Sequence, residues 1–390
     1  MSSTESSFTS VEVCAGAGGQ AVGLHGAGFR HLALIEIDTN ACETLKLNVE
    51  SKPDWRGCRV IPADLTQFDP AELALEPGQL DLLAGGVPCP PFSSAGKQLG
   101  QDDERDLFPT MLRLVDYLQP KAVMIENVRG LLEPPLKFRD YRENFIKRRL
   151  LEADYVICGW KVLEACDYGV PQLRPRAILV AMKREYAGHF VWPDPAESEL
   201  VTVAAALGAT MRKRFGTSPE GKAAYKLWSG KAKRGVAPTL VGGSKKHGGA
   251  DLGPTRAKNA WLKLGVDGHG VANELNEMTD PGRDLYGERG PKLTVTQAAL
   301  IQGFPKSWKF YGRKTAAYRQ VGNAFPPPVA EAVGREIISA LEAGMKNPSP
   351  ARPDTEEPGS DVLFEIPAPS ASVRTKVVDR GRDREGAVVG

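Results

Sequence analysis

The stretch Ser10–Phe29 reads SVEVCAGAGGQAVGLHGAGF and joins two patterns through the glycine-rich turn CAGAGG (14–19). The run SVEVCA (10–15) is typical of a buried strand, and QAVGLHGAGF (20–29) is typical of a helix. A glycine-rich turn between a strand and a helix lets a ligand approach the backbone and directs amide groups at it. Such turns also serve close packing alone, so this one is only a weak sign of a nucleotide-type site.

After this turn, short apolar runs alternate with longer helical patterns as far as about Lys183. Further strands are predicted at 32–38, 59–65, 80–86, 122–128, 157–165 and 177–183, with helices at 40–50, 106–119 and 138–153. This alternation predicts an α/β fold with a doubly wound, mostly parallel sheet. Ligands of such sheets bind outside the carboxyl ends of the strands, so residues at strand ends are the first candidates for a site.

The domain organisation follows from where that alternation stops, near Tyr186. The following segment is rich in Gly, Lys and polar residues and predicts a smaller, irregular second domain or insertion. Helical patterns return at 294–304 and 328–345, and the Pro-rich, charged end of the chain is typical of disorder. The expected parts are a first domain, an inserted domain, a return to the first domain and a tail, at 1–186, 187–290, 291–345 and 346–390.

Composition narrows the class of protein. The chain has 390 residues, of which 42% are hydrophobic and 25% charged, enough for two domains with sizeable cores. It has no run of 18 apolar residues and its start lacks a signal-peptide pattern, so we expect a cytoplasmic protein without membrane association. The 6 cysteines include no Cys-x-x-Cys pair. They are therefore expected to be reduced thiols, without a structural metal.

Charge is unevenly distributed. Residues 211–263 contain 13 Lys or Arg and 2 acidic residues, an excess of 11 positive charges in a chain of net charge +2. Such a run is typical either of a solvated face or of a surface that binds a phosphate backbone.

Acidic residues at two strand ends indicate a cofactor site. Glu36 ends the second strand, 17 residues after Gly19. An acid at that place commonly accepts hydrogen bonds from ribose hydroxyls, and Asp64, at the end of the third strand, could accept one from an adenine amino group. The cofactor is thus expected to contain adenosine; a dinucleotide and S-adenosylmethionine both remain open.

A second group of residues indicates the reactive centre. In GGVPCPPFSS (85–94) three prolines hold Cys89 in stiff, extended backbone after a predicted strand. Glu126 ends another strand, where a partly buried carboxyl tends towards a raised pKa. Since no histidine adjoins Cys89, Arg174 and Arg176, just before a further strand, are the candidates to activate the thiol.

Together these motifs resemble those of the DNA cytosine carbon-5 methyltransferases, over about residues 10–186 and 291–340. The matching segments, in the family's order, are CAGAGG, GGVPCPPFSSAGK, ENV (126–128), QLRPR (172–176), LTVTQAALIQGFP (293–305) and RQVGNAFPPPVA (319–330). The resemblance implies the Rossmann-like fold of class I S-adenosylmethionine-dependent methyltransferases, with S-adenosylmethionine as methyl donor. The cofactor contacts that it implies are Cys14, Ala15, Gly16, Gly18, Gly19, Glu36, Ile37, Asp64, Leu65 and Asn323. Cys14 stands where the family often has an aromatic residue and is interpreted as a packing residue.

The resemblance also implies the chemistry. Cys89 attacks carbon 6 of a cytosine flipped out of the duplex, and carbon 5 then takes the methyl group. Glu126 contacts ring nitrogen 3 and the amino group, Arg176 holds the base, and Asn127 and Arg174 shape the site. The segment 93–107, with hinges at Gly96 and Gly100, closes over the DNA.

DNA recognition is expected from 187–290, the family's target recognition domain, which contains the positively charged run. The predicted DNA contacts are Ser93, Gln172, Lys245, Lys246 and Arg256, the last three on glycine-rich loops. The expected partners are double-stranded DNA and a cognate restriction endonuclease acting on the same site, and the protein is expected to be a monomer. Two alternatives remain: a transfer RNA cytosine-5 methyltransferase with the same motifs, and a non-catalytic DNA-binding relative.

Overall fold

The structure is a computed structural model that describes residues 8–50, 52–88, 106–196, 199–242 and 250–348. These residues belong to one compact unit, Met1–Pro350. A second unit, Ala351–Gly390, lies outside the described residues, as do Cys89, Ser93, Lys245 and Lys246.

A single sheet organises the described chain, with strand order β3-β2-β1-β4-β5-β7-β6. Neighbours from β3 to β5 pair in parallel, whereas β7 is antiparallel to both β5 and β6. The expected mostly parallel sheet and each of its strands are confirmed, and β5 has the expected bounds. The strands are β1 Thr9–Val13, β2 Arg30–Glu36, β3 Arg59–Pro62, β4 Leu82–Gly85, β5 Ala122–Val128, β6 Tyr155–Glu164 and β7 Pro175–Lys183.

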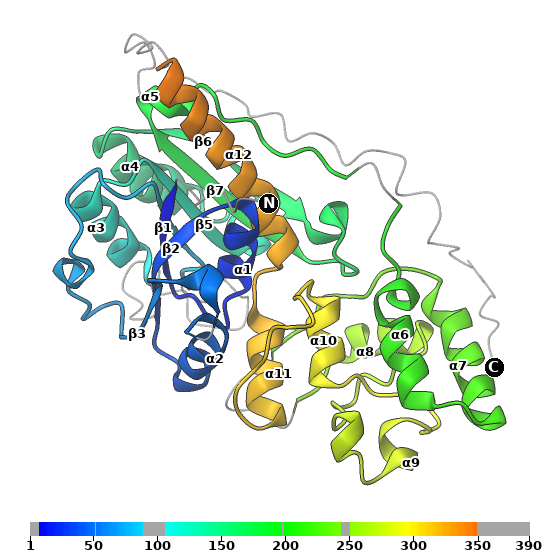
Figure 1. Ribbon diagram of the computed structural model, residues 1–390. Helices are drawn as coiled ribbons and strands as arrows, with labels where there is room; N and C mark the ends of the chain where they lie inside the picture. The colour runs from blue at the N-terminus through cyan, green and yellow to red at the C-terminus, as the bar shows by residue number, and fades with distance from the viewer. Residues whose placement is uncertain (1–7, 51, 89–105, 197–198, 243–249, 349–390) are drawn as a thin grey trace, which may run out of the picture. The chain divides into compact units, whose positions relative to one another are not determined.

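Both faces of the sheet are covered, which confirms the doubly wound arrangement (Figure 1). Side chains alternate across a strand, so Val123 and Ile125 of β5 enter one apolar core and Met124 the other. Helix α3 (Phe108–Leu118) packs into the first core, and helix α12 (Pro327–Lys346) covers the second. Burial on both faces explains why the strands read as nearly continuous apolar runs.

Glycines within the helices serve close packing. Helix α1 (Gly19–Ala27) lies against α12, and a Cβ added at Gly23 would stand 2.2 Å from the carbonyl oxygen of Pro327. Helix α12, late in the chain, therefore packs directly against the first helix after β1. The other helices are α2 Thr39–Val49, α4 Arg148–Glu152, α5 Arg184–Ala187, α9 Pro281–Asp284, α10 Val295–Ile301 and α11 Lys314–Asn323, with π-helical turns at Tyr141–Lys147 preceding α4.

The segment 187–290 differs from its expectation. Besides the short α9, its described residues contain three helices of nine or more residues, α6 Val203–Phe215, α7 Pro219–Ala232 and α8 Thr255–Lys263, where the sequence predicted an irregular segment. Thr202 and Ser218 cap α6 and α7 by accepting hydrogen bonds from backbone amides. The buried stripe of α6 consists of Val203, Leu207, Met211 and Phe215. That four-residue spacing was visible in the sequence, but Gly, Ala and Lys between its members concealed it.

Candidate active site

The glycine-rich turn joins β1 to α1 through three residues with positive φ, Cys14 (51°), Gly16 (53°) and Gly18 (84°). Only glycine adopts this conformation without cost, so two of the three positions suit their residues well. Apart from Gly16 and its two chain neighbours, no described residue has an atom within 4 Å of the place where a Cβ would stand at Gly16. The turn is therefore open on one side, where a ligand can approach the backbone.

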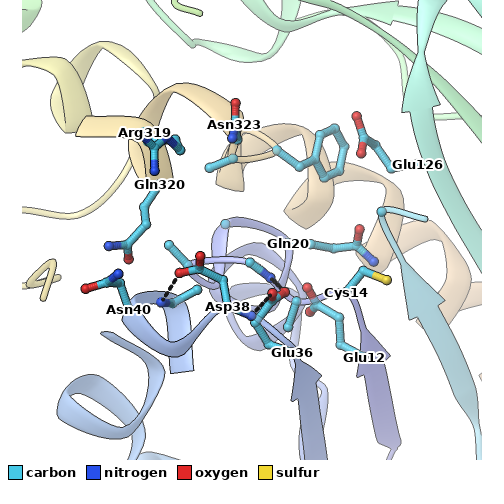
Figure 2. Close-up of a pocket in the computed structure, with 18 of the residues that line it drawn as sticks. Glu12, Cys14, Gln20, Glu36, Asp38, Asn40, Glu126, Arg319, Gln320 and Asn323 are labelled. Atoms are coloured by element: carbon cyan, nitrogen blue, oxygen red, sulfur yellow. Dashed lines mark hydrogen bonds between the residues drawn. The ribbon is translucent and has the colours of Figure 1, made fainter. Parts of the chain in front are cut away.

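Glu36, at the carboxyl end of β2, holds this turn in place. Its Oε2 accepts a hydrogen bond from the amide of Gly16 at 2.7 Å, and its Oε1 accepts from the amides of Ile37 and Asp38 at 2.9 and 2.8 Å. The side chain is buried, and these three backbone donors orient its carboxylate (Figure 2). A carboxylate held in this way still has lone pairs for a ligand hydroxyl.

A cavity of about 260 Å³ opens over the turn. It reaches from the ends of β1 and β2 to the ends of β4 and β5, and α11 closes it from the other side. The expected cofactor residues in its wall are Cys14, Ala15, Gly16, Gly19, Glu36 and Asn323, and the expected catalytic residue Glu126 also lines it. Parallel strands thus bring residues far apart in the chain to one edge of the sheet, as predicted.

Four of the expected cofactor residues do not line the cavity. Gly18 is covered by the ring of Trp308, which a Cβ would approach to 2.7 Å. Ile37 is 65% exposed, and Leu65 is buried in the core on the α3 side of the sheet. Asp64 lies exposed beyond the end of β3, where its Oδ1 accepts hydrogen bonds from the amide and hydroxyl of Thr66.

Several polar residues of the cavity were not predicted. Gln20 comes from α1, and Asp38 and Asn40 come from the start of α2. Helix α11 contributes Arg319 and Gln320, the former four residues before Asn323 and so on the same helical face. The four-residue spacing of Arg319 and Asn323 within RQVGN could have indicated that both face the cavity. It was not used, because no helix had been expected at 314–323.

The carboxyl ends of β5 and β7 bring together the expected base-binding pair. Arg176 Nε lies 2.8 Å from Glu126 Oε1, and both side chains are largely buried. A Cβ at Gly86 would stand 2.9 Å from the other oxygen of Glu126, so a larger residue there would move this carboxylate from its present place. Burial raises the pKa of Glu126, while the charges of Arg176 and Arg174 act to lower it. The net upward direction agrees with the expectation for a proton-sharing carboxyl.

Asn127 acts on the backbone next to Cys89. Its Nδ2 donates to the carbonyl of Val87 at 2.9 Å, and the amide of Leu107 donates to the carbonyl of Pro88 at 3.2 Å. The last described residues before Cys89 are therefore tied both to β5 and to the residues just before α3. Cys89 and the expected mobile segment up to residue 105 lie outside the described residues.

Arg174 connects separate chain segments through hydrogen bonds and does not line the cavity. It is almost completely buried and donates to the carbonyls of Leu240, Gly322 and Ala324, at 2.6 to 3.0 Å. It therefore fixes the end of α11, on which Asn323 lies, against the segment that follows α7. The prediction that Arg174 is a catalytic residue is therefore corrected: it is a positioning residue.

Gln172 cannot contact DNA in this conformation, so its predicted role is corrected. It is fully buried, and its side chain bonds the amide of Leu240, the carbonyl of Ile301 and the side chain of Gln302. Arg256 is exposed but lies in the first turn of α8 and not on a loop.

The described part of the chain bears on three further features: metal-binding groups, disulfides and membrane-spanning helices. Among those residues no group of three or more His, Cys, Asp or Glu is placed to hold a metal ion. The five described cysteines are free. Within the same ranges no helix is long and apolar enough to span a membrane.

Glu12 is an unusual feature of the cavity wall. This residue of β1 is buried, and its Oε2 has no hydrogen-bond partner among the described residues. Burial, and to a smaller degree the charge of Glu36, raise the pKa of Glu12 well above its ordinary value. The folded protein thus holds this proton more tightly than the unfolded chain does. The contribution to stability is full below the ordinary carboxyl pKa and is lost as pH rises through the folded-state pKa.

We therefore expect Glu12→Gln to stabilise the protein in alkaline but not in acidic solution. The free energy of unfolding should rise by on the order of 1–2 kcal/mol at pH 8 and should be nearly unchanged at pH 4. Urea denaturation at both pH values measures the difference. Glu50→Gln, at an exposed position after α2, is the matched control. A Glu12→Gln effect that is the same at both pH values would contradict the expectation.

The sheet order, the glycine turn with its strand-end acid and the adjoining ion pair of Glu126 and Arg176 are those of a class I S-adenosylmethionine-dependent methyltransferase fold. The sequence profile of the C-5 cytosine-specific DNA methylase family matches residues 8–339, and the chain belongs to this family. It is a DNA cytosine methyltransferase, and neither the transfer RNA enzyme nor the non-catalytic relative is favoured.

Individual relatives support this assignment. The chain is 49% identical to the Type II methyltransferase M.NaeI of Lentzea aerocolonigenes over 333 residues, 85% of this chain and 75% of that protein. It is 48% identical to the Type II methyltransferase M.NgoMIV of Neisseria gonorrhoeae over 338 residues, 86% and 98% of the two chains. The solved structure of the methyltransferase EhMeth of Entamoeba histolytica matches the fold with a TM-score of 0.56 at 15% identity, covering 86% of this chain and 98% of that one.

Proposed function

We propose that this methyltransferase moves a methyl group from S-adenosylmethionine to carbon 5 of a cytosine within one specific double-stranded DNA sequence. The observation that carries the proposal is the single cavity that extends from Glu36 to Glu126 across the carboxyl ends of the strands. The Type II names of the relatives support a place in a restriction-modification system, beside an endonuclease that acts on the same site. We further propose that it acts as a cytoplasmic monomer.

The residues of the cavity suit an adenosine-containing methyl donor. Glu36 would accept hydrogen bonds from ribose hydroxyls, since its carboxylate is already oriented by backbone amides. The open turn at Gly16 admits the ligand to the backbone, and Asn323 would close the pocket from α11. When bound, S-adenosylmethionine supplies an electrophilic methyl group.

Reaction at the base would proceed by addition and elimination. The Cys89 thiolate adds to carbon 6 of the flipped cytosine, and the electron pair of the 5,6 double bond becomes available at carbon 5 for the methyl group. Loss of the carbon-5 proton to a base then restores the double bond and expels the thiolate. Glu126 would hold a proton at ring nitrogen 3, which spreads the charge that develops on addition. Arg176 would keep Glu126 in position through their 2.8 Å contact.

DNA recognition is assigned to 187–290 as a target recognition domain. Its helices α6, α7 and α8 carry most of the basic residues counted between 211 and 263. One of these, Arg214, is buried and donates to Gln297 and to the carbonyls of Lys292 and Asp284, so it binds α6 to the chain near α10. Arg256 is exposed and available to a phosphate, and Lys245 and Lys246 remain proposed contacts.

Salt dependence tests this assignment. If Lys245 and Lys246 each neutralise a phosphate, changing both to glutamine should reduce the slope of log K against log salt concentration by about 1.8. The measurement is equilibrium binding to duplex DNA over a range of salt concentrations. A control variant with Arg30→Gln and Lys346→Gln changes two exposed basic residues outside the proposed domain and should keep the wild-type slope. Equal slopes in all three proteins would place Lys245 and Lys246 away from the DNA.

The function itself is tested by bisulfite sequencing of plasmid DNA from cells that express the protein. We expect 5-methylcytosine at one position of one short sequence and nowhere else. Methylation without sequence preference, or its absence from DNA, would refute the proposal.

A further inference from the structure

Helix α7 has an exposed face whose charges are all of one sign. Lys222, Lys226 and Lys233 are exposed, and within the described part of the chain none of them forms an ion pair with a carboxylate. Glu220 is the only acidic residue in the sequence between 216 and 250. The positive charge of this face is therefore available to an external anion.

This arrangement differs from that of other helices in the protein. On α4 and on α12 an exposed arginine is paired with a glutamate four residues away, at 2.8 and 2.5 Å. On α7 the same spacing joins two like charges, Lys222 and Lys226. Residues four apart are neighbours on a helix, so these two ammonium groups repel one another and destabilise the helix. An anion bound beside them would remove that repulsion.

The three lysines form a stripe along one side of α7. They follow one another at intervals of four and seven residues, and the stripe lies opposite the buried Gly221 and Trp228. A rise of 1.5 Å per residue gives the stripe a length of about 16.5 Å, which corresponds to about five base pairs of duplex DNA. The residues next to the stripe include Ala223 and Gly230, whose small side chains let a broad partner come close.

An arginine from α6 extends the stripe in a fixed position. Arg212 donates through Nη2 to the hydroxyl of Tyr225 at 3.1 Å, and its guanidinium lies 5.1 Å from the centre of that ring. Tyr225 comes three residues after Lys222 and is therefore its neighbour on the helix surface. A guanidinium suits bidentate contact with phosphate, and one already held on an aromatic ring loses less freedom when it binds.

One end of the stripe lies close to the proposed base site. After α7 the chain returns to the segment that leads into β7: the amide of Ala237 donates to the carbonyl of Pro171 at 2.9 Å, and the amide of Leu173 donates to the carbonyl of Ala237 at 2.8 Å. Lys233 comes four residues before Ala237. From there the stripe follows α7, which packs on the outer side of α6 (Figure 1). A duplex whose target base enters the site can therefore also reach the stripe.

We propose that Lys222, Lys226 and Lys233, together with Arg212, bind the DNA phosphate backbone beside the recognised sequence, on one flank and within about five base pairs of it. Contacts of this kind add affinity without adding sequence information. The inference rests on the proposed methylation of double-stranded DNA and adds a surface that extends the binding site past the recognised bases.

Two duplexes test the proposal, both with the target found by bisulfite sequencing. One extends about ten base pairs beyond the target on each side, and the other ends about one base pair from it. Changing all three lysines to glutamine should reduce the slope of log K against log salt concentration for the long duplex by about 2.7, or 0.9 for each contact. Between 50 and 200 mM salt the wild type should thus lose about 40-fold more affinity for the long duplex than the variant. For the short duplex the two slopes should agree.

The matched control removes the same number of charges elsewhere. Lys231→Gln, on the other side of α7, is combined with Arg30→Gln and Lys346→Gln, all at exposed positions. This protein should keep the wild-type slopes for both duplexes. The same reduction in the control as in the test variant would reveal a general effect of charge and would overturn the inference.

The remaining outcomes are equally distinct. Equal slopes of the test variant and the wild type for the long duplex would overturn the inference, and an equal reduction for both duplexes would place the lysines on the recognised sequence itself. Ethylation of single phosphates gives an independent readout: beyond the target it should weaken wild-type binding on one flank only, and it should not affect the variant there. Interference on both flanks would contradict the proposal. A wild-type protein that neither binds nor methylates the long duplex would instead refute the proposed function.

Discussion

Cys89→Ser is expected to lower kcat for DNA methylation by more than about 10³-fold. A serine hydroxyl without a strong adjacent base is a poor nucleophile, whereas a thiol readily yields the thiolate that adds to carbon 6. The backbone next to residue 89 is held through the carbonyls of Val87 and Pro88, so the substitution should leave the surrounding fold unchanged. Steady-state methylation of plasmid DNA measures the loss, and the melting temperature confirms folding.

Trapping of the covalent adduct makes this test specific. Fluorine at carbon 5 of the target cytosine cannot leave as a proton after methyl transfer, so elimination is blocked and protein and DNA stay joined through denaturing electrophoresis. The adduct should require S-adenosylmethionine and should be absent from Cys89→Ser. Cys14→Ser is the matched control and should still form it, because Cys14 belongs to the cofactor turn. An adduct mapped by peptide mass to a different cysteine would refute the assignment.

Glu126→Gln is expected to lower kcat by about 10²-fold with a much smaller change in KM for DNA. The amide keeps the size of the carboxyl but cannot share a proton with ring nitrogen 3, so charge that develops on addition is less stabilised. Single-turnover methylation and the rate of fluorocytosine trapping should fall together, because both include the addition step. Glu152→Gln, at an exposed position of α4, is the control.

The pH profile identifies the proton involved. Burial raises the pKa of Glu126, so its neutral form persists to higher pH than that of an ordinary carboxyl. If this form is the active one, kcat is full below the raised pKa and falls as pH rises through it. The Glu126→Gln variant should lack that alkaline fall. A fall of the same midpoint in both proteins would assign the titration to another group.

The Glu126 and Arg174 regions also show how the site is assembled from distant segments. Glu126 meets Arg176 across the antiparallel pair β5 and β7. Arg174, two residues earlier, donates instead to carbonyls at the end of α11. One short motif thus places one arginine beside Glu126 and the other behind the wall of the cavity. A change at Arg174 is therefore expected to act through Asn323 and not through direct contact with the base.

The sequence by itself determined the sheet, the place of the site and its strand-end acids. Alternating apolar and amphipathic runs report burial along the chain, and parallel strands necessarily bring their carboxyl ends to one edge. Glu36 and Glu126 could be predicted for that reason, each from its own strand. The short motif around Cys89 supplied the chemistry by resemblance.

Tertiary structure alone decided which side chains face the cavity and which support it. The sequence predicted functional roles for Gln172 and Arg174. Both side chains are instead buried and hydrogen-bonded to segments about 70 to 150 residues further along the chain. Trp308 shows the same principle: its Nε1 donates to the carbonyl of Ala17 at 3.0 Å and its ring covers Gly18. The buried atoms of Glu12 and Gln20 that have no hydrogen-bond partner among the described residues are likewise invisible in sequence. Periodicity reports local burial only, whereas a hydrogen-bond partner depends on where distant segments cross.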